Sequence, residues 1–260
     1  MPIDLAYHSF GSGPPLVILH GLFGCKENWR SLARQLAHQF QVFTLDQRNH
    51  GESPHVDEFS YQAMADDLLA FLNSQKLDQV HLLGHSMGGK TAMQFAACYP
   101  QRLTRLIIED ISPIAYAPHH LELFAALNQL PLKRLTSRSE ADRLLQAAVP
   151  DLAVRQFLLK NLQRQPEGGF AWRFNLPVLE KHYSELISTL DLMLPIKVTT
   201  LFLRGGRSDY LPPTLPLEIT RIFTEVKLQT IEDAGHWVHA EHPQAFLQAI
   251  NAFLRVTDGA

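Results

Sequence analysis

The chain alternates between short apolar runs of strand length and longer segments in which apolar residues recur every three to four positions. The apolar runs predict strands at Ile3–His8, Leu16–Leu19, Gln41–Leu45, Val80–Leu83, Thr104–Glu109, Val198–Leu203 and Val226–Ile231. The helical periodicity predicts helices at Asn28–Gln39, Tyr61–Ser74, Gly89–Ala97, Leu215–Phe223 and Pro243–Leu254. Such alternation predicts an α/β fold with a mainly parallel central sheet flanked by helices.

One long segment interrupts this alternation. From residue 111 to about residue 195 the pattern indicates helices, roughly at 118–130, 138–148, 151–163 and 175–190, and no convincing strand. We therefore expect residues 1–110 and 196–260 to form the α/β core, and residues 111–195 to form a helical cap inserted into it.

Composition places the chain among ordinary globular proteins. Of its 260 residues, 46% are hydrophobic and 19% are charged, and the formal net charge is −3. No basic cluster is present, so neither nucleic acid nor an anionic membrane surface is expected as a partner. No apolar run approaches the roughly 18 residues of a membrane span.

Cysteine usage bears on the compartment. Cys25 and Cys98 are far apart in the sequence and form no metal-binding pattern, so reduced thiols and no metal are expected. The first eight residues lack the pattern of a signal peptide, and we expect a cytoplasmic protein. The sequence gives no indication of the oligomeric state.

The segment from Gly84 to Gly88, Gly-His-Ser-Met-Gly, stands between a predicted strand and a predicted helix. A serine in this strand–turn–helix context is typical of a nucleophile elbow, in which the two glycines let the backbone turn tightly. Ser86 would stand at the tip of the turn. The backbone N–H of Met87, at the start of the helix, would point to where an oxyanion forms.

A serine nucleophile needs a base within hydrogen-bond reach and an acid that orients the base. His236 follows the last predicted strand, and Gly235 allows its loop to fold over the elbow. We therefore predict His236 as the base, with His239 and His242 as the next alternatives. His85, beside the serine, is expected to pack or hydrogen-bond inside the elbow.

An oxyanion hole needs a second N–H besides that of Met87. The loop His20–Gly24 follows a predicted buried strand, and its two glycines permit a close approach to the elbow. We predict the backbone N–H of Leu22 as the second donor, ahead of that of Phe23. His20 could brace the loop through its side chain.

These motifs resemble the α/β-hydrolase superfamily over nearly the whole chain. Further segments are similar to YbfF-type bacterial esterases and their mitochondrial abhydrolase relatives, namely His20–Gly24, Asp46–Gly51, Asp110–Pro113, Trp172–Asn175 and Gly235–Glu241. The resemblance implies an α/β-hydrolase fold with a helical cap. It also implies a cytoplasmic carboxylesterase or thioesterase that needs no cofactor and acts on small acyl esters, including acyl-CoA thioesters.

The sequence leaves two candidates for the acid. In most α/β-hydrolases the acid follows the strand that here ends at Leu203, but the family pattern places Ser208 at that position and Asp209 one residue late. Asp110 follows the first strand after the elbow helix, and YbfF-type esterases resemble this chain in carrying their acid there. We therefore predict Asp110, with Asp209 as the alternative. Either aspartate could instead cap a helix or brace a loop.

Several large side chains are candidates for the substrate pocket. We predict that Phe23, Trp172, Phe174 and Trp237 contact the substrate, although each could equally belong to the core. Arg48 lies in a loop near the predicted site. It could attract an anionic substrate group, but we expect it to pair with a nearby carboxylate.

These residues predict a serine hydrolase that transfers the acyl group of an ester or thioester to water through an acyl-enzyme. A C–C bond hydrolase, a perhydrolase or an acyltransferase could use the same three side chains. A non-catalytic binding protein on this fold is a further alternative, which the presence of both Ser86 and His236 disfavours.

Overall fold

The computed structural model describes residues 1–192 and 195–255. Within them, one seven-stranded sheet has the order β1-β3-β2-β4-β5-β8-β9. Its strands are β1 (Tyr7–Phe10), β2 (Pro15–Leu19), β3 (Gln41–Leu45), β4 (Val80–His85), β5 (Leu103–Glu109), β8 (Thr200–Gly205) and β9 (Val226–Ile231). Only the edge strand β1 is antiparallel to its neighbour; the other neighbouring strands pair in parallel. The predicted α/β class and parallel sheet are confirmed.

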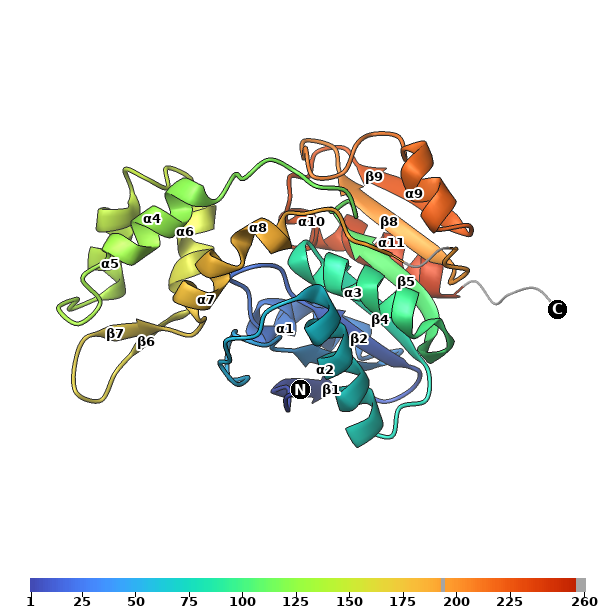
Figure 1. Ribbon diagram of the computed structural model, residues 1–260, viewed down its shortest axis with the longest axis horizontal. Coiled ribbons are helices and arrows are strands. Elements are labelled where there is room, and N and C mark those ends of the chain that lie inside the picture. The colour runs from blue at the N-terminus through green and yellow to red at the C-terminus, as the bar shows by residue number, and fades with distance from the viewer. Residues whose placement is uncertain (193–194, 256–260) are drawn as a thin grey trace.

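Helices cover both faces of the sheet (Figure 1). Those of the core are α1 (Arg30–Leu36), α2 (Tyr61–Ser74), α3 (Met87–Cys98), α9 (Leu217–Ile222), α10 (Val238–Glu241) and α11 (Pro243–Arg255), with short 3-10 turns at Lys26–Trp29 and Pro100–Arg102. Side chains on β2 alternate between the two faces. Val17 and Leu19 belong to the cluster that includes α2 and α3, and Leu16 and Ile18 to the cluster with α1 and α11. A continuous apolar run thus becomes a strand buried on both sides.

The elements between β5 and β8, referred to below as the cap, form a separate group on the left of Figure 1. They are α4 (Leu121–Gln129), α5 (Arg138–Leu145), α6 (Leu152–Leu159), β6 (Leu162–Arg164), β7 (Phe170–Trp172), α7 (Leu176–Lys181) and α8 (Tyr183–Leu186). The predicted domain ranges stay a prediction, and residues 193–194 and 256–260 within them lie outside the described part of the chain.

The structure corrects the expectation that the cap contains no strand. Strands β6 and β7 pair as an antiparallel hairpin, with Leu162 opposite Trp172. Each strand has only three residues, too few to show an alternating pattern. The available signal was the pair Gly168 and Gly169, both with positive φ, which close the hairpin loop.

Several other predicted elements have different bounds, as two in the core illustrate. The N-terminal strand is β1, Tyr7–Phe10, and not Ile3–His8, because the N–H groups of Ile3 and Ala6 donate to side chains of Asp67 and Ser53. The predicted helix Asn28–Gln39 is a 3-10 turn followed by the shorter α1. Among the described helices, none combines the length and the apolar character that crossing a membrane requires.

Candidate active site

Ser86 occupies a sharp turn between β4 and α3. Its backbone has φ 53° and ψ −119°, a conformation that costs a non-glycine residue about 1–3 kcal/mol. The turn is held because the Ser86 N–H donates to the carbonyl of Glu109 on β5 (3.1 Å) and the Ser86 carbonyl accepts from the Lys90 N–H (3.0 Å). A Cβ at Gly84 would collide with the backbone of Gly88, which explains the glycines at these positions. The strand–turn–helix prediction is confirmed.

His236 lies in the loop between β9 and α10, with its ring over this turn. Its Nε2 is 3.0 Å from Ser86 Oγ, and the Tyr210 ring stacks on the imidazole with a centroid distance of 4.0 Å. The backbone carbonyl of His236 accepts a hydrogen bond from His85 Nε2 (3.0 Å). The imidazole is therefore positioned through both its ring and its backbone.

Asp110 is the first residue after β5 and is fully buried. Its Oδ2 accepts from His236 Nδ1 (2.7 Å) and also from the Ser208 hydroxyl, and its Oδ1 accepts from the Gly205 N–H (2.9 Å). These bonds place the His236 proton on Nδ1 and leave the Nε2 lone pair facing the Ser86 hydroxyl. Asp209, the alternative acid, is exposed, and its neighbour Ser208 supports Asp110 instead.

The loop Gly21–Gly24, called the oxyanion loop below after its predicted role, is a tight turn. The Gly21 carbonyl accepts from the Gly24 N–H (2.9 Å) and from His20 Nδ1 (2.8 Å), while His20 Nε2 accepts from the Gln47 N–H (3.0 Å). Two donors on this carbonyl fix the peptide group that carries the Leu22 N–H. A Cβ on Gly21 would lie 3.1 Å from Ser86 Cβ, so only glycine lets the loop approach the elbow this closely.

The second possible loop donor, Phe23, already has an acceptor. Its N–H donates to Nε2 of the buried His50 (3.3 Å), and His50 Nδ1 donates to the Arg48 carbonyl (3.0 Å). Burial holds the pKa of His50 well below its usual value, so the ring remains a neutral acceptor. This contact favours Leu22 over Phe23 as the donor to an oxyanion. Sequence reasoning did not single out His50.

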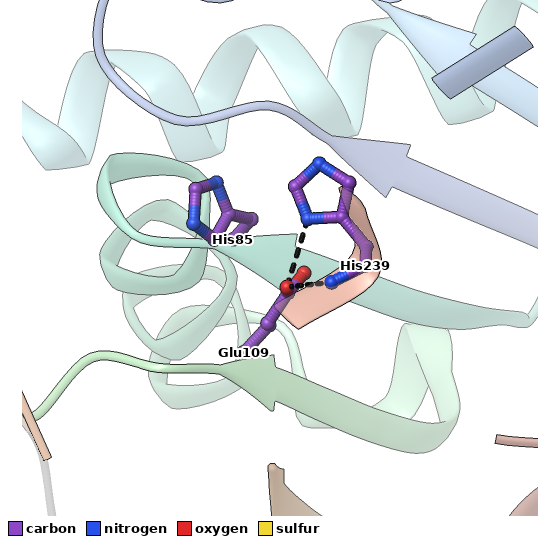
Figure 2. A group of neighbouring side chains, drawn as sticks. All are labelled: His85, Glu109 and His239. Atoms are coloured by element: carbon purple, nitrogen blue, oxygen red, sulfur yellow. Dashed lines mark hydrogen bonds and ion pairs between the residues drawn. The ribbon is translucent and has the colours of Figure 1, made fainter. Parts of the chain in front are cut away.

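A buried polar layer consists of His85, Glu109 and His239 (Figure 2). It supports the His236 loop, because His85 Nε2 donates to the His236 carbonyl. Glu109 Oε1 accepts from the backbone N–H of His239 (2.9 Å) and from its Nδ1 (2.8 Å). Burial raises the pKa of Glu109 to about 7 and lowers the pKa values of both histidines to about 3. His85 thus hydrogen-bonds outward to the His236 loop and not inside the elbow, and sequence reasoning missed Glu109. Trp29 covers His239 by stacking at 4.0 Å.

The same three side chains are the group within the described residues whose ligand atoms lie close enough to hold a metal ion, within 4.8 Å of one another. As arranged, His239 Nδ1 donates to Glu109 and His85 Nε2 donates to a backbone carbonyl. Both nitrogens thus present protons and not lone pairs, so the layer is built for hydrogen bonding.

His242, the remaining alternative base, donates to the Asp233 carbonyl (3.0 Å).

A cavity of about 290 Å³ opens at Ser86 and is lined by residues of both core and cap. Phe23 and Trp237 line it, together with Leu123, Val149 and Phe157 of the cap, which the sequence did not single out. The wall is largely apolar, as expected for a site that accepts an acyl chain.

The structure does not bring Trp172 and Phe174 to the lining of this cavity. Phe174 is buried and packs against Phe23 with 5.0 Å between ring centroids, and Trp172 stacks on Phe174, also at 5.0 Å. Both rings therefore support Phe23 from the cap side. Arg48 makes the expected carboxylate pair, with Nε 2.7 Å from Asp67 Oδ2, and is fully buried.

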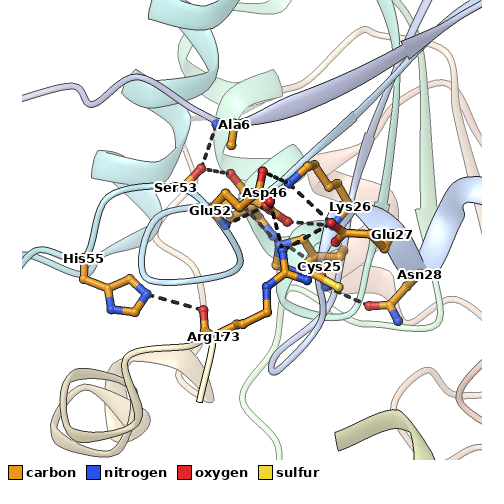
Figure 3. Close-up of polar contacts among 12 residues, drawn as sticks. Ala6, Cys25, Lys26, Glu27, Asn28, Asp46, Glu52, Ser53, His55 and Arg173 are labelled. Carbon is orange, nitrogen blue, oxygen red and sulfur yellow. Dashed lines mark hydrogen bonds and ion pairs between the residues drawn. The ribbon is translucent and has the colours of Figure 1, made fainter. Parts of the chain in front are cut away.

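Polar contacts join the cap to the core on another side of the site (Figure 3). Arg173, which follows β7, lies 3.2 Å from Glu27 Oε1, and its carbonyl accepts from His55 Nε2. Lys26 is buried beside this pair, with Nζ 2.7 Å from Asp46 Oδ2 and 2.8 Å from Glu52 Oε2. The carboxylates of Asp46 and Glu52 thus compensate the charge of the buried Lys26 ammonium, and burial of this charge without a partner would be costly.

Comparison with known proteins extends these observations. The chain is 40% identical over 264 residues to sn-1-specific diacylglycerol lipase ABHD11 of Mus musculus, a match that covers 97% of this chain and 86% of that protein. It is 36% identical over 241 residues to esterase YbfF of Escherichia coli (strain K12), covering 92% of each. A solved structure described as a marine microorganism esterase matches with a TM-score of 0.94 and 41% identity, over 96% of this chain and 99% of that one.

The family described as alpha/beta hydrolase fold matches residues 14–243, which is most of the chain. The fold class and the resemblance predicted from the sequence are thereby confirmed. With esterases and lipases among relatives that match nearly end to end, the chain belongs to the α/β-hydrolase family and is an ester hydrolase of the esterase and lipase type.

Proposed function

We propose that this ester hydrolase is a carboxylesterase and thioesterase that cleaves small acyl esters through Ser86, His236 and Asp110. One observation carries the proposal: an unbroken series of hydrogen bonds runs from Ser86 Oγ through both ring nitrogens of His236 to Asp110, and Ser86 and His236 line a largely apolar cavity. That order of contacts is what a nucleophile, its base and an orienting acid require.

In the first step, Ser86 Oγ attacks the acyl carbonyl carbon while His236 Nε2 takes the hydroxyl proton. The carbonyl oxygen becomes an oxyanion held by the backbone N–H groups of Leu22 and Met87. Collapse of this intermediate breaks the bond to the leaving group, which departs with the proton from Nε2. The product of this half-reaction is an acyl-Ser86 ester.

Water completes the reaction. His236 Nε2 takes a proton from water, the hydroxide oxygen attacks the acyl-enzyme, and collapse releases the carboxylic acid and restores the Ser86 hydroxyl. Throughout, the carboxylate of Asp110 keeps the proton on His236 Nδ1 and stabilises the transient imidazolium. The bonds from Gly205 and Ser208 hold this carboxylate in place.

The cavity supports acyl groups of limited size as substrates. Its volume of about 290 Å³ is at the low end of small-molecule sites, and the apolar side chains of Leu123, Val149 and Phe157 suit a hydrocarbon chain. Two substrate classes beyond simple esters deserve inclusion in the assay: acyl-CoA thioesters, and a diacylglycerol because the mouse relative is named as a diacylglycerol lipase.

The test is hydrolysis of p-nitrophenyl esters from acetate to palmitate, of several acyl-CoA thioesters and of a diacylglycerol, by the wild type and by Ser86→Ala. We expect the wild type to prefer short or medium acyl chains and the folded variant to lose at least about 10³-fold in kcat. Equal activity of the two proteins would refute the assigned nucleophile. A wild type inert on every substrate would favour the C–C hydrolase or binding-protein alternatives.

A further inference from the structure

The oxyanion loop is held from two sides. At Phe23 the backbone has φ +60°, a left-handed conformation that a non-glycine residue adopts only when its surroundings enforce it. The core contributes His50, which accepts from the Phe23 N–H. The cap contributes Asn161, whose Nδ2 donates to the Phe23 carbonyl at 2.7 Å.

Asn161 comes from a rigid part of the cap. It stands between α6 and β6, its own N–H donates to the Leu158 carbonyl (2.9 Å), and its carbonyl accepts from the Arg173 N–H (2.9 Å). The side chain is fully buried. Its amide is therefore presented to Phe23 by a backbone that is already fixed on both sides.

The chemistry of the two groups fixes which end of the Asn161 amide faces Phe23. A backbone carbonyl can only accept, so it is the NH2 group of Asn161 that faces Phe23. Without this donor, a buried carbonyl in the strained turn would lose its partner, which is unfavourable for a buried acceptor. The turn would then be free to relax, and the Leu22 N–H would move with it, since Leu22 and Phe23 are the two central residues of the same turn.

Aromatic packing couples the same residue to the cap. The Phe23 ring lies 5.2 Å from that of Phe124 on α4 and 5.0 Å from that of Phe174. These contacts place the Phe23 side chain among cap residues, while its N–H is bound by the core. The cap thus contacts the oxyanion loop through both backbone and side chain.

We propose that Asn161 is a positioning residue for the oxyanion hole: by holding the Phe23 carbonyl, it keeps the Leu22 N–H aimed at the reacting carbonyl, so the inserted cap completes the hole. This inference rests on the proposed function. Loss of an oxyanion donor itself costs about 10²–10³ in kcat, so loosening its support should cost about tenfold.

The experiment compares Asn161→Ala and the isosteric Asn161→Asp with Asn175→Ala. Asn175 is the matched control because its Nδ2 also bonds the core, to Asn49 Oδ1 at 3.0 Å, without touching the oxyanion loop. Each variant is measured for melting temperature, kcat and KM on p-nitrophenyl butyrate, and Ki for butylboronic acid, whose tetrahedral serine adduct places an oxygen in the hole. Hydrogen exchange of a peptide spanning residues 20–26 is followed by mass spectrometry.

We expect both Asn161 variants to lose about tenfold in kcat with KM within twofold, to bind the boronic acid about tenfold more weakly, and to exchange the loop amides faster. Asn175→Ala should keep kcat and Ki within twofold, even with an equal loss of melting temperature. Unchanged exchange and Ki in the Asn161 variants, or equal losses in Asn175→Ala, would overturn the inference. Because exchange needs no substrate, it judges Asn161 even if the wild type proves inert on esters.

Discussion

The core and the cap meet at one cavity, yet they position their residues in different ways. At the sheet edge, each proposed catalytic side chain follows a strand whose neighbours fix it: the Ser86 N–H bonds the Glu109 carbonyl, and the Asp110 N–H bonds the Leu203 carbonyl at 2.9 Å. In its described residues, the cap contains helices of four to nine residues and one hairpin whose two strands have three residues each. Helices this short are marginal alone and depend on packing.

The difference teaches which part of the molecule controls which property. Strand pairing in the core fixes the proposed nucleophile, base and acid, because backbone ladders tolerate little displacement, whereas the proposed oxyanion donor also depends on Asn161 of the cap. The cap supplies much of the apolar wall, through residues such as Leu123, Val149 and Phe157, and we expect their replacement to alter the shape of the cavity without moving the proposed triad. Three predictions challenge this division.

The largest effect should follow from replacing the acid in the core. Asp110→Asn keeps the shape of the side chain but lets His236 lose its Nδ1–H tautomer, and we expect kcat to fall by about 10³-fold or more. Asp209→Asn is the matched control and should stay within twofold of the wild type, since this side chain is exposed. Steady-state kinetics on p-nitrophenyl butyrate measure kcat for both variants and the wild type. The reverse pattern would place the acid in the loop after β8.

A smaller effect, on acyl-chain preference, should distinguish substitutions at two half-buried aromatic residues of the cap. Phe157 lines the cavity and Trp172 does not, so Phe157→Ala should shift the ratio of kcat/KM for octanoate over acetate by about tenfold. Trp172→Ala should leave this ratio within twofold. In both variants kcat on acetate should stay within threefold of the wild type. A loss of kcat on acetate in Phe157→Ala would show that the cap affects the chemistry through the cavity wall as well as through Asn161.

The smallest expected effect concerns the free energy of unfolding and involves His239, in the buried polar layer of the core. Burial lowers the pKa of His239 to about 3, so below pH 6.5 the unfolded chain protonates this imidazole while the folded protein does not. Its contribution to stability is therefore complete above pH 6.5 and is lost as the pH falls towards 3. In His239→Gln this loss should be absent, and the stability difference between the two proteins should change by up to about 1.4 kcal/mol per pH unit. Urea unfolding at pH 6.5, 5.5 and 4.5 measures the free energy of unfolding of both proteins. A difference between the two that stays the same at all three pH values would contradict the lowered pKa of His239.

Local patterns in the sequence determined the elbow, the loop after β2 and the parallel sheet. A strand–turn–helix with glycine on both sides of Ser86 is a property of neighbouring residues, and continuous apolar runs such as that of β2 depend only on burial of both faces. The meeting of Ser86 with His236 could thus be predicted, with His236 placed at the same sheet edge because parallel strands end together.

The tertiary structure decided what depends on contacts between distant segments. The choice of Asp110 over Asp209 as the partner of His236 follows from the pairing of β5 with β8, which brings Gly205 and Ser208 onto its carboxylate from 95 and 98 residues away. Glu109 meets His239 across 130 residues, and Asn161 meets Phe23 across 138. No local periodicity encodes such meetings, because they arise only when strand register and cap packing bring the segments together.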